Sequence, residues 1–149
     1  MIHDANTLVI ENLIRNALSQ DSRIKVALLF GSHVSGTTTP MSDIDVGIIT
    51  DADLSLMDLG YLTATLESAL HSTVDLIALN DLYKRRPQLA FNIVASCRVV
   101  FSRDEEVLVR FKRNTYLYFI DTKPLREMTD AALRQRIAAG KFGVKNYVG

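Results

Sequence analysis

Two aspartates one residue apart are the strongest candidates for chemistry in this sequence. Asp43 and Asp45 belong to an alternating segment, residues 43–49, in which Gly47 shares their side and apolar residues occupy the other. Because side chains on a strand have a period of two, both carboxylates point to the same face. Two such carboxylates repel each other, and a hard divalent cation such as Mg²⁺ removes the conflict. Asp43 and Asp45 therefore predict a metal site, and the pair could hold the two cations used in in-line phosphoryl transfer.

A third carboxylate follows on a later segment. Asp75 lies in the apolar run from Val74 to Leu79, which predicts a strand, and an aspartate in so apolar a strand needs a reason. If this strand lies next to the preceding one, Asp75 completes a three-carboxylate metal cluster with Asp43 and Asp45. The alternatives are structural, with Asp75 as a cap or turn residue and the aspartate pair as edge-strand charges that discourage aggregation.

A glycine and a serine end the most apolar segment of the chain. Residues 24–30 are nearly all apolar, the run stops at Gly31-Ser32, and ten residues separate Ser32 from Asp43. Glycine lets backbone amides approach an anion closely, and a helix that starts here would favour phosphate. Gly31 and Ser32 therefore predict a phosphate-binding turn, with a plain tight turn as the alternative.

Hydrophobic periodicity predicts the elements that position these residues. The nearly continuous apolar run before Gly31 is expected at the centre of a sheet. The predicted strands are residues 24–30, 43–49, 74–79 and 99–101. The predicted helices are residues 10–18, 59–70, 81–96 with an interruption at Pro87, a stretch ending before Pro124, and 125–139 with Gly140 as its stop.

This order of elements predicts an α/β (α+β) fold. Strands interspersed with helices imply a small mixed sheet with helices covering one face. Only about a dozen residues of loop join the segments 24–30 and 43–49, so an antiparallel, hairpin-like pair is expected. Helices from residue 103 onward would follow the sheet.

The composition fits a globular protein. The chain has 149 residues, of which 48% are apolar and 23% charged, enough for one domain with a single core. No apolar run predicts a membrane span, and the N-terminus shows no secretory signal. Cys97 is the only cysteine, so no intrachain disulfide can form, and we expect a cytoplasmic protein.

The formal net charge is zero but unevenly distributed. Residues 1–102 carry 7 Lys and Arg against 11 Asp and Glu, whereas residues 103–149 carry 10 against 6. The basic tail is expected to be a solvated surface, with docking of an acidic partner or a nucleotide phosphate as the alternative. Lys84-Arg85-Arg86 is predicted to be a solvated helix face, with partner or phosphate contact as its alternative. No nucleic-acid-binding motif is present, so direct binding of nucleic acid is not expected.

The spacing Gly31-Ser32, ten residues, Asp43-Ile44-Asp45 resembles the GS-x10-D-x-D signature of the nucleotidyltransferase superfamily related to DNA polymerase beta. The compact length and the third carboxylate, Asp75, are similar to the minimal nucleotidyltransferase (MNT) group. Several members of that group are antitoxins of HEPN-domain ribonuclease toxins. The resemblance implies a single nucleotidyltransferase domain over residues 1–149, with a catalytic core at about 24–102 and a C-terminal helical segment at about 103–149.

The resemblance also implies an activity. AMP would be transferred from ATP, with Mg²⁺, to a hydroxyl of a HEPN toxin, a tyrosine, and pyrophosphate would be released. Asp43 and Asp45 would bind the metals that carry ATP, and Asp75 would share one metal and help deprotonate the hydroxyl. Gly31 and Ser32 would hold the terminal phosphates. No membrane is expected among the partners.

One departure from the family pattern leaves alternatives open. Many members carry an arginine after Gly-Ser, where this chain has His33-Val34. The cation for the triphosphate would then come from His33, from Lys25, from the basic tail or from a partner. The alternatives in function are adenylylation of a small molecule such as an aminoglycoside antibiotic, and a non-catalytic antitoxin that masks its toxin.

Overall fold

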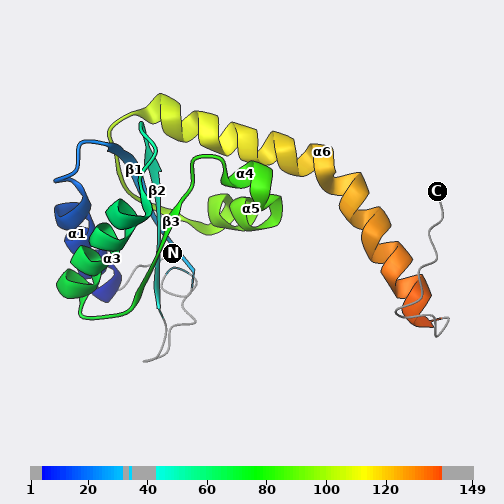
Figure 1. The fold of residues 1–149 in the computed structure, drawn as a ribbon, viewed down its shortest axis with the longest axis horizontal. Coiled ribbons are helices and arrows are strands. Elements are labelled where there is room, and N and C mark those ends of the chain that lie inside the picture. The colour runs from blue at the N-terminus through cyan, green and yellow to red at the C-terminus, as the bar shows by residue number, and fades with distance from the viewer. Residues whose placement is uncertain (1–4, 32–33, 35–42, 139–149) are drawn as a thin grey trace.

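The computed structural model describes residues 5–31, 34 and 43–138. Helices are interspersed with strands along this part of the chain, and each predicted strand is present within two residues of its expected bounds. The elements are α1 (Ala5–Leu18), β1 (Ile24–Phe30), β2 (Ile44–Thr50), α3 (Leu56–Leu70), β3 (Val74–Ala78), α4 (Leu82–Arg85), α5 (Pro87–Ser96), β4 (Arg98–Ser102) and α6 (Glu105–Ala138) (Figure 1). In the described part of the chain, no helix is long and apolar enough to cross a membrane.

The four strands form one mixed sheet in the order β3-β2-β1-β4. β1 pairs antiparallel with both β2 and β4, which confirms the predicted antiparallel pair and the predicted central place of β1. β2 pairs parallel with β3, and α3 provides the crossover that a parallel pair needs. We call the end of the sheet where β1 finishes and β2 and β3 begin the lower end, as it lies in Figure 1. The opposite end is the upper end.

Helices cover both faces of the sheet, so the expectation of one covered face is wrong. On one face, α1 and α3 pack against residues such as Leu29 and Val46. On the other face, α4, α5 and the beginning of α6 pack against residues such as Leu28 and Ile49. Six of the seven residues of β1 are buried, and a central strand that is apolar on both sides needs cover on both.

The C-terminal region forms one helix where two were predicted. The expected break at Pro124 does not occur, because α6 continues to Ala138. A proline inside a helix removes one hydrogen bond and bends the axis without having to end it. Figure 1 shows α6 curving in its second half. Pro87, by contrast, separates α4 from α5 as predicted and occupies the first turn of α5, where a missing N–H is tolerated.

Candidate active site

Asp45 and Asp75 lie side by side at the lower end of the sheet. They are register partners in the parallel pair of β2 and β3, and neighbouring strands are about 4.8 Å apart. On its other side, Asp45 is the register partner of Phe30, the last residue of β1. Asp45 is half-buried and Asp75 is exposed. The two strands are therefore neighbours, which is the condition on which the predicted carboxylate cluster depends.

The backbone of Gly31 lies directly against the carboxylate of Asp45. The φ angle of Gly31 is 80°, in the left-handed region that favours glycine. A Cβ atom at this position would lie 2.1 Å from Oδ2 of Asp45, which leaves no space for a side chain. The backbone N–H of Val34 donates to the carbonyl of Gly31 over 3.1 Å, so the chain turns as soon as β1 ends. Glycine at position 31 is thus required by both conformation and close approach.

The other predicted site residues are less closely placed. Asp43 is exposed and precedes β2, while Ser32 and His33 lie outside the described residues. Within the described part of the chain, no three His, Cys, Asp or Glu side chains come close enough to hold a metal ion by themselves. The cluster of Asp43, Asp45 and Asp75 therefore stays a prediction. A pair of carboxylates nevertheless fits Mg²⁺, which usually takes one or two protein carboxylates and completes its shell with phosphate oxygens and water.

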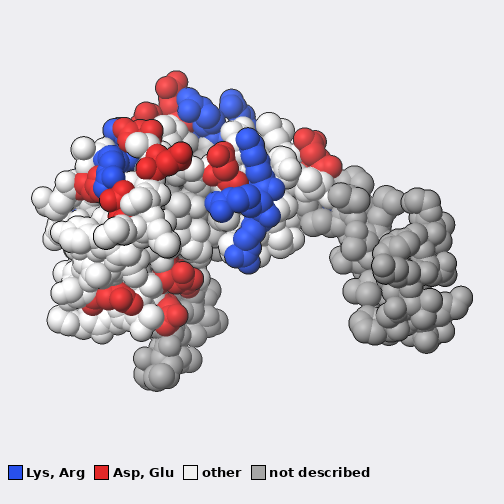
Figure 2. Space-filling model, in the orientation of Figure 1, with Lys and Arg blue, Asp and Glu red and all other residues white. Residues whose placement is uncertain are grey.

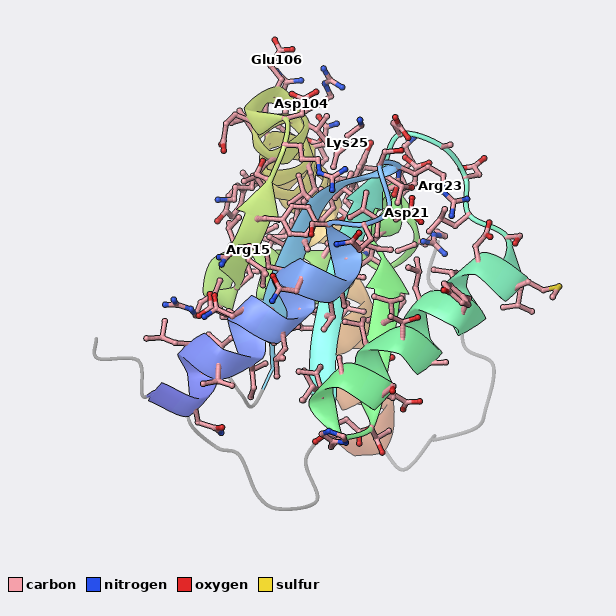
Figure 3. All side chains as sticks on the ribbon, turned by 90° about the vertical axis from the view of Figure 1, so that its left-hand side faces the viewer. Arg15, Asp21, Arg23, Lys25, Asp104 and Glu106 are labelled. Carbon is pink, nitrogen blue, oxygen red and sulfur yellow. The ribbon has the colours of Figure 1, made fainter. Side chains whose placement is uncertain are left out.

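Lys25 lies at the wrong end of the sheet to reach a nucleotide at Asp45. Its Nζ atom is 3.3 Å from the carboxylate of Asp51, just beyond the end of β2. Asp51 is six residues from Asp45, roughly 20 Å along an extended chain. Figure 3 shows Lys25 in the same upper part of the molecule as Asp21 and Arg23. Lys25 is therefore removed from the candidates for binding the triphosphate.

Ion pairs compensate the aspartates of the upper end. Arg23 lies 2.8 Å from Asp21 and 3.2 Å from Asp58. The hydrogen bond from Arg23 holds the pKa of Asp21 below its ordinary value. Hydrogen bonds from the backbone and side chain of Ser55 lower the pKa of Asp58, and Arg23 adds to this effect. Asp58 and Ser55 also form the capping box that starts α3, so these carboxylates serve the fold.

One ion pair at the lower end was missed by the sequence reasoning. Arg98 is the register partner of Leu29, two residues before Gly31, and its guanidinium lies 2.9 Å from Glu11. Glu11 is only 5% exposed, so the pair is largely removed from water and ties α1 to β4. No local pattern links two residues 87 positions apart. Arg98 is thus held by a structural partner beside the Gly31 turn.

Comparison with known families places the chain among the nucleotidyltransferases. Residues 12–106 match the family described as Polymerase beta, Nucleotidyltransferase. The match covers more than half of the chain and includes Gly31, Asp43, Asp45 and Asp75. The chain therefore belongs to the polymerase beta nucleotidyltransferase family, which confirms the resemblance inferred from the motif. No curated protein matches the chain.

Similar solved structures come from toxin–antitoxin complexes. A chain of a toxin–antitoxin complex with AMP-PNP is 24% identical, with a TM-score of 0.58 over 87% of this chain and 96% of that one. A chain of a mutant MntA–HpeT toxin–antitoxin is 24% identical, with a TM-score of 0.66 over 82% of this chain and 96% of that one. A chain of the complex between a tri-AMPylated Shewanella oneidensis HEPN toxin and an MNT antitoxin is 21% identical, with a TM-score of 0.54 over 89% of this chain and 97% of that one. This chain therefore has the fold of chains from such complexes over nearly their whole length, in agreement with the predicted mixed α/β fold.

Proposed function

We propose that this chain is a metal-dependent protein adenylyltransferase that acts as an antitoxin. It transfers AMP from ATP to a tyrosine hydroxyl of a HEPN ribonuclease toxin in the cytoplasm. The observation that carries the enzyme class is the register pairing of Asp45 with Asp75, beside Gly31, in a member of this family. The toxin partner is supported by the likeness to MNT antitoxin complexes, one of which contains a tri-AMPylated HEPN toxin.

Each site residue has a role in this proposal. Asp45 and Asp75, together with Asp43, would bind the Mg²⁺ that accompanies ATP. Mg²⁺, when bound, would neutralise phosphate charge and polarise the α-phosphate. The backbone N–H groups at Gly31 and Ser32 would hold the terminal phosphates, because a turn with glycine lets amides approach an anion. Asp75, the more exposed of the register pair, would accept the proton of the acceptor hydroxyl.

The proposed reaction is an in-line displacement at phosphorus. The acceptor oxygen forms a bond to the α-phosphorus of ATP while the bond from that phosphorus to the bridging oxygen breaks. Pyrophosphate leaves with the bridging oxygen, and the hydroxyl proton moves to the carboxylate of Asp75. The product carries a bulky anion on the tyrosine, which would block an RNA-binding face of the toxin by size and by charge.

The test uses a HEPN-domain ribonuclease as the acceptor protein. The two purified proteins are mixed with ATP and Mg²⁺, and the toxin is followed by intact mass and by RNA cleavage. The expected result is a mass increase of one or more AMP units together with loss of cleavage. An unchanged mass with suppressed cleavage would identify masking and contradict the catalytic proposal. AMP transfer to an aminoglycoside but not to the toxin would assign the small-molecule alternative.

A further inference from the structure

A group of exposed cations on α4, at the residue that follows it and on α6 forms no ion pair within the described part of the chain. We call this group the cation band, and its members are Lys84, Arg85, Arg86, Arg110 and Arg113. Figure 2 shows Lys and Arg gathered over the region of α4 and α6. Asp81 and Arg110 line the same surface hollow, but no ion pair joins them. Arg110 and Arg113 also line a hollow with Glu105 and Glu106, and no ion pair joins them to either glutamate. All five cations of the band are exposed to solvent.

The remaining Lys and Arg side chains of residues 5–103 all have a structural partner. Arg23, Lys25 and Arg98 pair with carboxylates. Arg15 and Arg103 donate to backbone carbonyls. The fold thus uses its other cations in this range internally, while the cation band forms no ion pair with a described residue and Lys84 makes only a cation–π contact with the ring of Tyr83. This contrast distinguishes the band from an ordinary solvated surface, the reading that the sequence had favoured for Lys84-Arg85-Arg86.

The cation band lies on the same side of the sheet as the aspartates. Phe30 belongs to the core between the sheet and α4, α5 and α6, together with Leu82 and Phe111. Asp45 is the register partner of Phe30, and directly opposed residues of an antiparallel pair share one face. Asp75 is in turn the register partner of Asp45. A protein seated on α4 and α6 would therefore cover the face that carries the carboxylates, with Arg110 toward the upper end, in a hollow that Asp51 also lines.

Apolar side chains accompany the cations on α6. Val109 is 58% exposed, Leu117 53% and Ile120 62%, and helical spacing places them on one stripe with the two arginines of the band. Single-stranded RNA is usually bound with free aromatic faces on which bases stack. Here the ring of Tyr116 is already packed edge-on against Phe91, with 5.6 Å between centroids. A surface that mixes exposed aliphatic groups with arginines fits a protein partner better.

We propose that the cation band and the apolar stripe of α6 form the docking surface for the acceptor protein. Its matching face would carry Asp and Glu side chains around an apolar centre. This inference rests on the proposed function, because the docked protein is the one that receives AMP. Complementary charge guides encounter and orientation, so the band acts on binding of the acceptor and leaves the chemical step to the aspartates.

The test compares two variants with the same change in net charge. Arg110→Gln/Arg113→Gln removes two positive charges from the band. Ala64→Glu/Ser68→Glu adds two negative charges to exposed positions of α3, on the opposite face of the sheet. Binding of the HEPN ribonuclease that serves as acceptor is measured without ATP at several salt concentrations. Transfer is then measured at saturating toxin, and the melting temperature of each variant is recorded.

The band variant should bind the toxin roughly tenfold more weakly and show a smaller salt dependence than the parent, because two of the five cations are removed. Its transfer rate at saturating toxin and its melting temperature should match the parent, and the α3 control should bind like the parent. Unchanged binding by the band variant would overturn the proposal. So would a labelled single-stranded RNA whose affinity depends on the band while toxin binding does not. Band-dependent toxin binding with no AMP transfer by the parent would refute the proposed function and leave the docking surface standing.

Discussion

At the upper end of the sheet, Asp21, Asp51 and Asp58 each lie within 3.3 Å of a Lys or Arg nitrogen, whereas at the lower end neither Asp43 nor Asp75 forms an ion pair with a described residue. Figure 3 shows Arg23 and Lys25, two of the cations in these pairs, in the upper part of the molecule. The same sheet therefore pairs the aspartates of its upper end with cations, while Asp43 and Asp75 at the lower end have no such pair among the described residues. Carboxylates on adjacent strands repel each other, and a ligand that brings its own cation relieves this repulsion.

The largest expected effect separates the two ends of β2. Asp45→Asn should lower transfer by about 10³-fold or more, because several kcal/mol of charge stabilisation at the phosphates depends on the metal site. The matched control is Asp51→Asn, which breaks only the pair with Lys25 and should leave transfer unchanged. Initial rates of AMP transfer to the toxin measure both variants. Equal losses in the two variants would erase the distinction between the ends.

The next prediction tests the role of Asp75, the second carboxylate of the register pair at the lower end. If Asp75 accepts the hydroxyl proton, Asp75→Asn should lower transfer by roughly 10²-fold and retain measurable affinity for ATP. Asp53→Asn, another exposed aspartate, serves as the control and should behave like the parent. Rates are compared with ATP affinity from calorimetry. A variant that unfolds would assign Asp75 a structural role instead.

Gly31 tests whether the lower end tolerates a side chain. Gly31→Ala should lose about 1–2 kcal/mol of stability, because alanine adopts a left-handed conformation poorly and its Cβ would push Asp45 aside. Transfer should fall as well, since the carboxylate of Asp45 must move. Gly60→Ala is the control: its Cβ would meet no atom within 4 Å, and alanine inside a helix should raise stability by about 0.5–1 kcal/mol. Denaturant unfolding measures both, and stabilisation by Gly31→Ala would contradict the close contact.

The smallest expected effect concerns the ion pairs of the upper end. Asp21 and Asp58 have lowered pKa values in the folded protein, so their contribution to stability is present above the unfolded pKa of about 3.9 and is lost as the pH falls through the folded value. Arg23→Gln should lower the melting temperature slightly at pH 7, and the difference from the parent should shrink below about pH 4. Transfer at pH 7 should not change. A difference that grows in acid would refute the assigned pairing.

Much of the fold was accessible from local sequence patterns. The apolar run 24–30 predicted β1 with its observed bounds, and alternation over 43–49 predicted β2 within a residue. The cover on both faces of the sheet was not predicted, because helical periodicity shows that a helix is amphipathic but not which face of a sheet receives it. The continuous α6 was missed because the rule that proline breaks helices has exceptions where only one hydrogen bond is lost.

The part of the candidate site that depends on local spacing could be predicted from the sequence. The part that depends on how distant strands pair could not. The motif that joins Gly31, Asp43 and Asp45 is local. The shared face of the two aspartates stays a prediction, because Asp43 precedes β2. The pairing of Asp45 with Asp75 joins residues 30 positions apart and followed only once β3 was known to neighbour β2. The sequence alone places Lys25 far from the Gly31 turn, because it precedes the end of its own strand by five residues. It could therefore be excluded from binding the triphosphate without the structure.

Thermal unfolding in the presence of nucleotide shows whether the lower end of the sheet binds ATP through a divalent cation. At ATP 100-fold above its dissociation constant, the parent protein should gain about 2.7 kcal/mol of stability in the presence of Mg²⁺. With ATP and a chelator the gain should be much smaller, and Asp45→Asn should lose most of the Mg²⁺-dependent part. Equal stabilisation of the parent with and without Mg²⁺ would contradict the account.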